Sequence, residues 1–172
     1  MTERVRPLDG QDLEAVASIY AHYVTASTAT FETVPMTTQD WAEKAEDIAR
    51  RGWPFLVAVT DDDGPSERVI GFAYTTFWRA RPAYDLTVEE TIYLEPGETG
   101  RGVGTALLTA VLDATRAAGA RQAIAVVSDR GAEGSLALHR KVGFAEAGHL
   151  KAIGEKLGVR LGTYLLQKSL ED

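Results

Sequence analysis

Two adjacent acidic residues and one distant histidine are the side chains best suited to moving protons. Glu89 and Glu90 lie in the run TVEETIYL, and His139 lies in SLALHRKVGF. A carboxylate in a partly dry cleft can act as a general base, and an imidazole can protonate a leaving group or relay a proton. The sequence contains no cysteine, which excludes a cysteine nucleophile, a zinc–thiolate site and a disulfide framework.

The alternating glycines Gly100, Gly102 and Gly104 are a second chemical feature, set between a strand-like and a helix-like run. Their spacing fits neither a P-loop, since no lysine follows Gly102, nor the dinucleotide pattern G-x-G-x-x-G. Glycines let backbone N–H groups turn toward one point, and the first N–H groups of a helix lack internal partners. The turn can therefore hold an anion such as a pyrophosphate, with Arg101 adding charge. The alternative is a helix-capping turn in which the glycines serve geometry alone.

These residues need a scaffold, which the spacing of the apolar residues predicts. We expect four helices, at 9–24, at 37–52, from the glycine turn to Gly119, and at 135–144. We expect strands at 55–60, 68–78, 86–94, 121–127 and 158–170, with a turn at 61–67 and a loop at 79–85. The order βαα, then ββ, then βαβαβ predicts one α/β domain over residues 1–172, with a mixed central sheet and helices on both faces.

Length, composition and charge exclude several classes of protein. The chain has 172 residues, of which 45% are hydrophobic and 25% charged, as in a globular domain with a sizeable core. A net charge of −7 argues against nucleic acid as a partner. No apolar run approaches the ~20 residues that span a bilayer, and the N-terminus has no signal-peptide pattern. We therefore expect a cytoplasmic protein without a membrane partner.

The glycine turn, the strand before it and the histidine helix after it resemble, in this order, the GNAT superfamily of N-acetyltransferases. The family signature R/Q-x-x-G-x-G/A falls on residues 99–104, with Thr99 at its first position. The resemblance implies that the turn holds the pyrophosphate of acetyl-CoA, the co-substrate, and that no metal takes part. It implies that N–H groups near Tyr93 and Leu94 polarise the thioester carbonyl. The implied cofactor contacts are Ile92, Tyr93, Leu94, Thr99, Gly100, Arg101, Gly102, Val103, Gly104, Thr105 and Ser135.

Three segments narrow the resemblance to the phosphinothricin and methionine-sulfoximine acetyltransferase family. They are STATFETVP, FWRARPAYDLTVEETIYL and ALHRKVGF, and the match covers nearly the whole chain. The resemblance implies an amino-acid-like acceptor, a homodimer, and acceptor contacts from Phe31, Arg81 and Tyr84. The chain departs from the family pattern at four further positions, which bear on the amino-acid substrate more than on the cofactor or the reaction. Ala132 replaces a CoA-contacting Asn, and the others are Ala137 for Arg, Arg160 for Trp and Gly162 for Asp.

The expected reaction is attack of an amine on a thioester, which requires a base because the amine arrives as an ammonium ion. Strand alternation places Glu89 on the more polar face, with two threonines and a tyrosine, and Glu90 with three aliphatic residues. The family pattern also puts its catalytic glutamate at Glu89, which we predict as the base. A β-bulge, common in this strand of the superfamily, would exchange the two faces.

His139 takes the place where many superfamily members carry a tyrosine. It either protonates the departing CoA thiolate or relays the amine's proton, or it only packs within its helix. Ser135 lies one helical turn earlier, but no nucleophile elbow surrounds it, so we predict a helix cap rather than a nucleophile. His22 and His149 lack metal-ligand or triad spacing and are predicted to be structural.

The acceptor is the least determined part of the function. Arg79 and Arg81 offer planar forks for a substrate carboxylate, or they are solvated loop residues. One alternative keeps the fold and acetylates another amine, a polyamine or a protein N-terminus. The other is a non-catalytic CoA-binding regulator.

Overall fold

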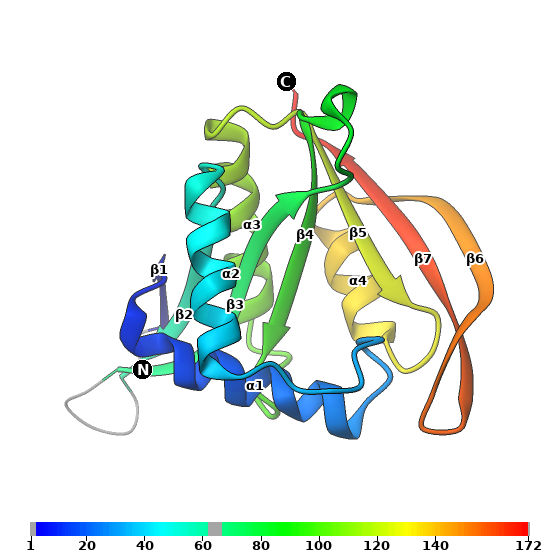
Figure 1. Cartoon of the computed structure of the whole chain (residues 1–172), viewed down its shortest axis with the longest axis horizontal. Coiled ribbons are helices and arrows are strands. Elements are labelled where there is room, and N and C mark those ends of the chain that lie inside the picture. Colours follow the sequence, from blue (N-terminus) through cyan, green and yellow to red (C-terminus); the bar gives the residue numbers. More distant parts are fainter. Residues whose placement is uncertain (1–2, 62–66, 172) are drawn as a thin grey trace.

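A seven-stranded sheet runs through the whole molecule, as shown by a computed structural model that describes residues 3–61 and 67–171 (Figure 1). Its strand order is β1-β2-β3-β4-β5-β7-β6, and every neighbouring pair is antiparallel except β4 and β5. The strands are β1 (Glu3–Pro7), β2 (Phe55–Thr60), β3 (Arg68–Phe77), β4 (Thr87–Leu94), β5 (Gln122–Ser128), β6 (Ala145–Lys156) and β7 (Val159–Ser169).

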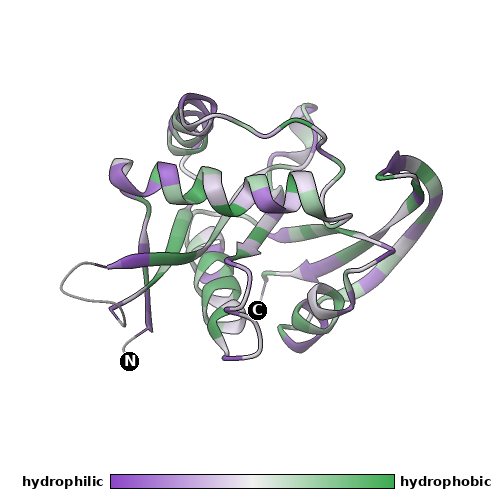
Figure 2. Cartoon of the chain, turned by 90° about the horizontal axis from the view of Figure 1, so that it is seen from below, coloured by the Kyte–Doolittle hydropathy of each residue, from purple (hydrophilic) through white to green (hydrophobic). Residues whose placement is uncertain are grey.

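Four helices cover the two faces of this sheet (Figure 2). They are α1 (Leu13–Ala26), α2 (Thr38–Arg50), α3 (Val103–Ala117) and α4 (Glu133–Lys141), with 3₁₀ turns η1 (Gly10–Asp12) and η2 (Pro82–Tyr84). The predicted α/β fold, with a mixed sheet and helices on both faces, is confirmed. None of the helices in the described parts of the chain is long and apolar enough to cross a membrane.

The two faces of the sheet have different cores. Under α1 and α2 lies a largely aromatic cluster, which includes Tyr20, Trp41 and Phe72. Under α3 and α4 lies a largely aliphatic cluster built on residues such as Leu107 and Val111. Successive residues of β3 and β4 alternate between these clusters because side chains of a strand point to opposite faces. A one-residue step along β4 therefore carries a side chain from one core to the other.

Strands β4 and β5 separate part-way along their length. They pair from Thr87↔Gln122 only as far as Glu90↔Ala125, whereas β4 continues to pair with β3 up to Leu94. Figure 1 shows the two strands diverging toward the end that leads into α3. Each residue of β4 from Val88 to Leu94 pairs with one residue of β3, with no extra residue on either strand. The β-bulge that would have exchanged the two faces of β4 is therefore absent from this pairing.

Strand β6 is the main element that the sequence did not predict. It is an edge strand whose side chains are exposed along most of its length. Its pairing with β7 shifts register twice, and Ala152 lies in the left-handed region with φ of 55°. Such a strand has no regular apolar alternation, which is the signal that sequence reasoning depends on. The middle of the turn expected at 61–67 lies outside the described residues.

Candidate active site

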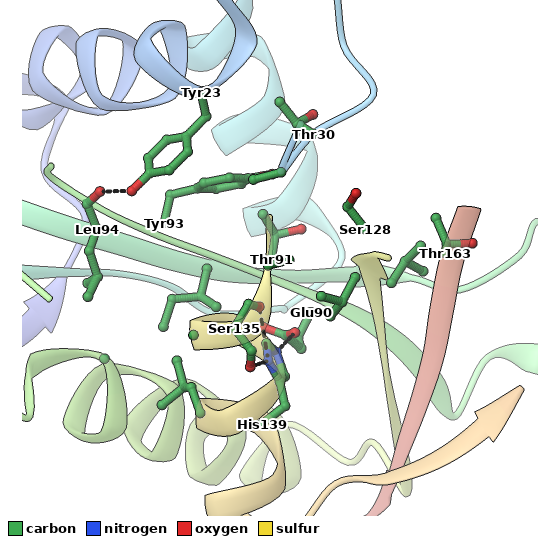
Figure 3. A pocket seen from close by; sticks show the side chains of 18 of the residues that line it. Tyr23, Thr30, Glu90, Thr91, Tyr93, Leu94, Ser128, Ser135, His139 and Thr163 are labelled. Carbon is green, nitrogen blue, oxygen red and sulfur yellow. Dashed lines mark hydrogen bonds and ion pairs between the residues drawn. The ribbon is translucent and has the colours of Figure 1, made fainter. Parts of the chain in front are cut away.

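A cleft of about 1190 Å³ opens where β4 and β5 separate (Figure 3). Residues from α1, α4, β4, β7 and the glycine turn line it. Twelve of the predicted site residues lie along it: Phe31, Glu89, Ile92, Tyr93, Leu94, Thr99, Gly100, Gly102, Gly104, Thr105, Ser135 and His139. The structure thus brings together segments that are more than 100 residues apart in the sequence.

The glycine turn forms one end of the cleft. Gly100 and Gly102 have φ of 81° and 93°, and a Cβ at either position would meet no atom within 4 Å. Gly102 caps α3 without a side-chain hydrogen bond to the first helical turn. Gly104 serves another purpose, since its Cβ would lie 3.2 Å from Leu138 and 3.4 Å from Leu94. The first two glycines therefore adopt a left-handed backbone beside open space, whereas Gly104 allows close packing.

The side chain of Arg101 points toward carboxylates rather than into the cleft. Its guanidinium lies 2.8 Å from Glu98 and 3.0 Å from Glu3, and Glu98 also binds Arg68. The charge that the sequence led us to expect at the turn is thus directed elsewhere, while the backbone of Arg101 remains within the turn. Val103, another predicted contact, is buried in the aliphatic core.

The exposed edge of β4 forms the long wall of the cleft. The N–H of Glu95 donates to Ile70 on β3 at 2.9 Å, so along this stretch the backbone groups of Ile92 and Leu94 face the gap left by β5. The Tyr23 hydroxyl donates to the Leu94 carbonyl at 2.6 Å (Figure 3). By the same alternation the backbone of Tyr93 faces β3. Of the N–H groups near Tyr93 that were predicted to polarise the thioester carbonyl, those of Ile92 and Leu94 are the ones that face the gap.

Glu89 lies on the α1/α2 face of β4 and is half-buried. Burial raises the pKa of its carboxyl group, and the neighbouring charge of Glu90 raises it further, against the opposing effects of Lys44 and Arg79. A carboxylate with a raised pKa is a better proton acceptor near neutral pH than an exposed one. This environment supports the predicted role of Glu89 as a base.

Glu90 lies on the other face and binds His139. Its Oε1 is 2.6 Å from His139 Nε2, and the two residues are 5% and 2% exposed. His139 Nδ1 lies 2.7 Å from the carbonyl oxygen of Ser135 and 3.3 Å from its hydroxyl. Burial by itself lowers the pKa of His139, but the hydrogen bond and charge of Glu90 outweigh it and raise the pKa above its ordinary value. Sequence reasoning did not find this pair, because nothing in the chain signals a contact between residues 49 positions apart.

The loop after α1, which carries Phe31, forms another side of the cleft. Buried Lys156 of β6 donates to the carbonyls of Thr30 at 2.8 Å and Tyr23 at 3.1 Å. A Cβ at Gly154 would lie 2.5 Å from the ring of Phe31, so this glycine lets the ring lie against β6. The curved β6 thus fixes the loop that carries Phe31, and sequence analysis missed this role of Lys156.

The cations that line this side of the cleft are Arg79, which the sequence offered as a carboxylate partner, and Lys44, which it did not. Arg81 and Tyr84 are exposed around η2 and are not among the lining residues of the cleft. Arg79 and Lys44 do line it, and both act on the charge of Glu89. The Lys44 ammonium lies 5.0 Å from the ring centroid of Tyr74. Lys44 lies on α2, 35 residues before Arg79. The sequence of this helix shows only an amphipathic pattern, so it did not indicate a role for Lys44 in the cleft.

The departure at Gly162 has a structural explanation. Its N–H donates to Asp129 at 2.8 Å, and a Cβ there would lie 2.2 Å from the carbonyl of Leu150. The other oxygen of Asp129 binds His149 at 2.9 Å, and the His149 ring stacks on Tyr164 at 4.2 Å. Glycine is therefore required by close packing where β5, β6 and β7 meet, and His149 has the structural role that was predicted.

Comparison with known proteins places the chain among acetyltransferases. The family model described as "Acetyltransferase (GNAT) family" matches residues 16–144. The chain belongs to the GNAT family. It is 39% identical over 166 residues to a phosphinothricin N-acetyltransferase of Alcaligenes faecalis, covering 96% of this chain and 82% of that one. It is 30% identical over 171 residues to an L-methionine sulfoximine/L-methionine sulfone acetyltransferase of Pseudomonas aeruginosa, covering 99% and 96%. The resemblance drawn from the sequence is thereby confirmed.

Solved structures of GNAT proteins share the fold over almost the whole chain. A phosphinothricin acetyltransferase from Sinorhizobium meliloti, in complex with acetyl-CoA, superposes with a TM-score of 0.89 at 38% identity, covering 98% of this chain and 89% of that one. A Salmonella typhimurium protein solved with its cofactor acetyl-CoA has a TM-score of 0.93 at 27% identity, covering 100% and 96%. Two solved structures that hold acetyl-CoA thus have the architecture described above.

Proposed function

We propose that this protein transfers the acetyl group of acetyl-CoA to the amino group of a small amino-acid-like acceptor, of the phosphinothricin or methionine-sulfoximine type. One observation carries the proposal: a single cleft joins the glycine turn at the start of α3 to a half-buried carboxylate on which two cations act. The names of the relatives support the same acceptor class.

The cleft fits acetyl-CoA along its length. The pyrophosphate would rest on the N–H groups of the Gly100–Gly102 turn and the start of α3. The pantetheine arm would lie in the gap between β4 and β5 and take hydrogen bonds from the backbone of Ile92 and Leu94, as an added strand does. One of these N–H groups would hold the thioester oxygen as it gains negative charge.

The acceptor would enter from the α1/α2 face, beside Phe31. Its carboxylate would bind Lys44 and Arg79, and its ammonium group would lie at Glu89. Glu89 removes a proton, the amine lone pair attacks the thioester carbon, and the carbon–sulfur bond breaks. The acetyl group ends on nitrogen and the electron pair of the broken bond on sulfur.

A different acceptor is the second candidate. Arg81 is outside the cleft and Gly162 is required by packing, so two features of the amino-acid-specific pattern do not reach the acceptor. An amine without a carboxylate, such as a polyamine, would then use Glu89 and leave Lys44 and Arg79 unpaired.

A homodimer is also part of the proposal. The family resemblance implies it, and the β6–β7 arm exposes apolar side chains that a second copy would cover: Leu150, Ile153, Leu157 and Val159. Light scattering after gel filtration should give twice the monomer mass of 18.6 kDa.

The test is thiol release from acetyl-CoA against a panel of amino acids, phosphinothricin, methionine sulfoximine and polyamines. We expect the fastest release with an amino-acid-like acceptor, and a higher melting temperature with saturating acetyl-CoA. Fastest release with a polyamine would favour the second candidate. No melting shift with acetyl-CoA would overturn the acetyltransferase proposal, and a shift without turnover of any amine would indicate a CoA-binding regulator.

A further inference from the structure

Glu90, His139 and Ser135 form a connected chain of polar groups on the wall of the cleft that faces α4 (Figure 3). Glu90 and His139 are almost fully buried, whereas Ser135 is half-buried at the start of α4, and all three line the cleft. The second carboxylate oxygen of Glu90 is buried and has no hydrogen-bond partner in the described part of the chain. A buried polar atom without a partner costs free energy, so its presence in a native fold calls for an explanation.

The hydrogen-bond geometry fixes where the protons are. The carbonyl oxygen of Ser135 can only accept, so His139 Nδ1, 2.7 Å away, must carry a proton. Nε2 and Glu90 Oε1 are 2.6 Å apart and must share a further proton, since two lone pairs would repel. The pair therefore holds one more proton than a neutral imidazole beside a carboxylate would.

This arrangement excludes the most familiar use of a serine, a histidine and a carboxylate. In a hydrolase triad the histidine nitrogen nearest the serine is an acceptor and removes the serine proton. Here that nitrogen is already protonated and can only donate, toward the carbonyl and the hydroxyl of Ser135. The same residues are thus set to release a proton into the cleft rather than to activate a nucleophile.

We propose that Glu90 keeps His139 protonated so that His139, through the Ser135 hydroxyl, delivers a proton to the sulfur of departing CoA. This step rests on the proposed acetyl transfer. When the carbon–sulfur bond breaks, the electron pair on sulfur takes the Ser135 proton, and Ser135 Oγ takes the Nδ1 proton of His139. His139 is left neutral, with its remaining proton on Nε2 and donated in a hydrogen bond to the Glu90 carboxylate, and solvent returns one proton after the products leave. Glu90 acts through His139 and is a positioning residue.

Among the described residues, Glu90 and Ser135 are the groups that raise the pKa of His139 against the effect of burial. His139 faces Glu90 from β4, Ser135 from its own helix, and the ring edge of Phe144 at 5.2 Å. Lys141 lies exposed along the same cleft, and Glu89 acts on the pair from across β4. Glu90 is thus the group whose removal should change the protonation of His139 most.

The first test is a proton NMR titration of the histidine rings, which needs neither acetyl-CoA nor turnover. The sequence has three histidines, and His139→Gln identifies one signal by its loss. We expect His139 to lose its proton at higher pH than an ordinary histidine, whose pKa is near 6.5, and at lower pH in Glu90→Gln than in the wild type. Glu89→Gln is the matched control on the opposite face and should leave the His139 titration high. A wild-type His139 that titrates at or below the ordinary histidine pKa overturns the proposal, even if Glu90→Gln fails to fold.

The second test is the pH dependence of kcat. Thiol leaving groups need modest help because their pKa is near 8.5, so Ser135→Ala should slow turnover by up to about 10²-fold, the low end for acid–base assistance. Loss of rate at alkaline pH should begin at lower pH in Glu90→Gln than in the wild type, while the acetyl-CoA KM stays near the wild-type value. An unchanged alkaline limb in Glu90→Gln would overturn the relay. If His139 has a raised pKa but the protein acetylates no amine, the proposed acetyl transfer is overturned, whereas the proton-holding role of the Glu90–His139 pair is retained.

Discussion

Glu89 and Glu90 are adjacent and chemically identical, yet the fold gives them opposite environments. Glu89 lies half-buried on the α1/α2 face with Lys44 and Arg79 nearby, and Glu90 lies buried on the α3/α4 face against His139. In the proposed reaction one carboxylate accepts a proton from the amine, and the other holds a proton on a histidine. Because successive side chains of a strand point to opposite faces, one strand would then separate proton removal from proton delivery.

The largest expected loss of kcat comes from Glu89→Gln, which replaces one carboxylate oxygen by an amide nitrogen. Glu89→Gln keeps the shape but cannot take the ammonium proton, so kcat should fall by about 10²–10⁴-fold, the usual contribution of a general base. Acetyl-CoA affinity, measured by calorimetry, should stay near the wild-type value. Glu90→Gln is the matched control, and a loss there that equals or exceeds that at Glu89 would show that the two faces carry the opposite roles.

A substitution at the glycine turn should affect both faces equally. Gly102 has φ of 93°, which a β-branched residue adopts only with strain, so Gly102→Val should rearrange the turn. Given about 1–3 kcal/mol for such strain, we expect acetyl-CoA binding to weaken by roughly 100-fold. The check is loss of the acetyl-CoA-induced rise in melting temperature. Gly134→Ala, at a position where a Cβ meets no atom within 4 Å, should keep that rise.

Removing a cation should weaken the Glu89 face alone. Lys44→Met keeps much of the apolar stem but loses the charge for a substrate carboxylate, so the acceptor KM should rise about tenfold, in line with 1.5–3 kcal/mol for charged hydrogen bonds. The acetyl-CoA KM should not change. Arg81→Ala is the comparison variant outside the cleft, and a larger effect there than at Lys44 would show that η2 moves to the acceptor.

The smallest effect concerns the electrostatic coupling between the two carboxylates. Burial, and then the charge of Glu90, raises the pKa of Glu89, so kcat/KM should fall as pH drops through that raised pKa, because the base becomes protonated. Glu90→Gln removes the like charge and should move this acid limb to lower pH. The pH profile of kcat/KM measures the shift, and a limb that moves to higher pH would contradict the coupling.

Local sequence determined the cofactor half of the cleft. The strand TVEETIYL, the alternating glycines and the helix after them are contiguous, and each has its own signal: β-rich composition, positive-φ glycines and helical spacing. Strand alternation alone also separated Glu89 from Glu90, because β4 pairs regularly with β3 over its whole length. Local backbone conformation depends on neighbouring residues, so the amino-acid sequence can predict it directly.

Only the tertiary structure decided the partners across the cleft. Lys44 and Lys156 reach the acceptor side from α2 and β6, and His139 meets Glu90 from another element altogether. Arg101, placed at the turn by its sequence position, is drawn instead to Glu98 and Glu3. Such contacts depend on how strands diverge and helices pack. They join residues that are far apart in the chain, and no local sequence pattern predicts which of them will meet. The sequence alone thus determined most of the helices and strands and the glycine turn, and packing decided which charged side chains surround the cleft.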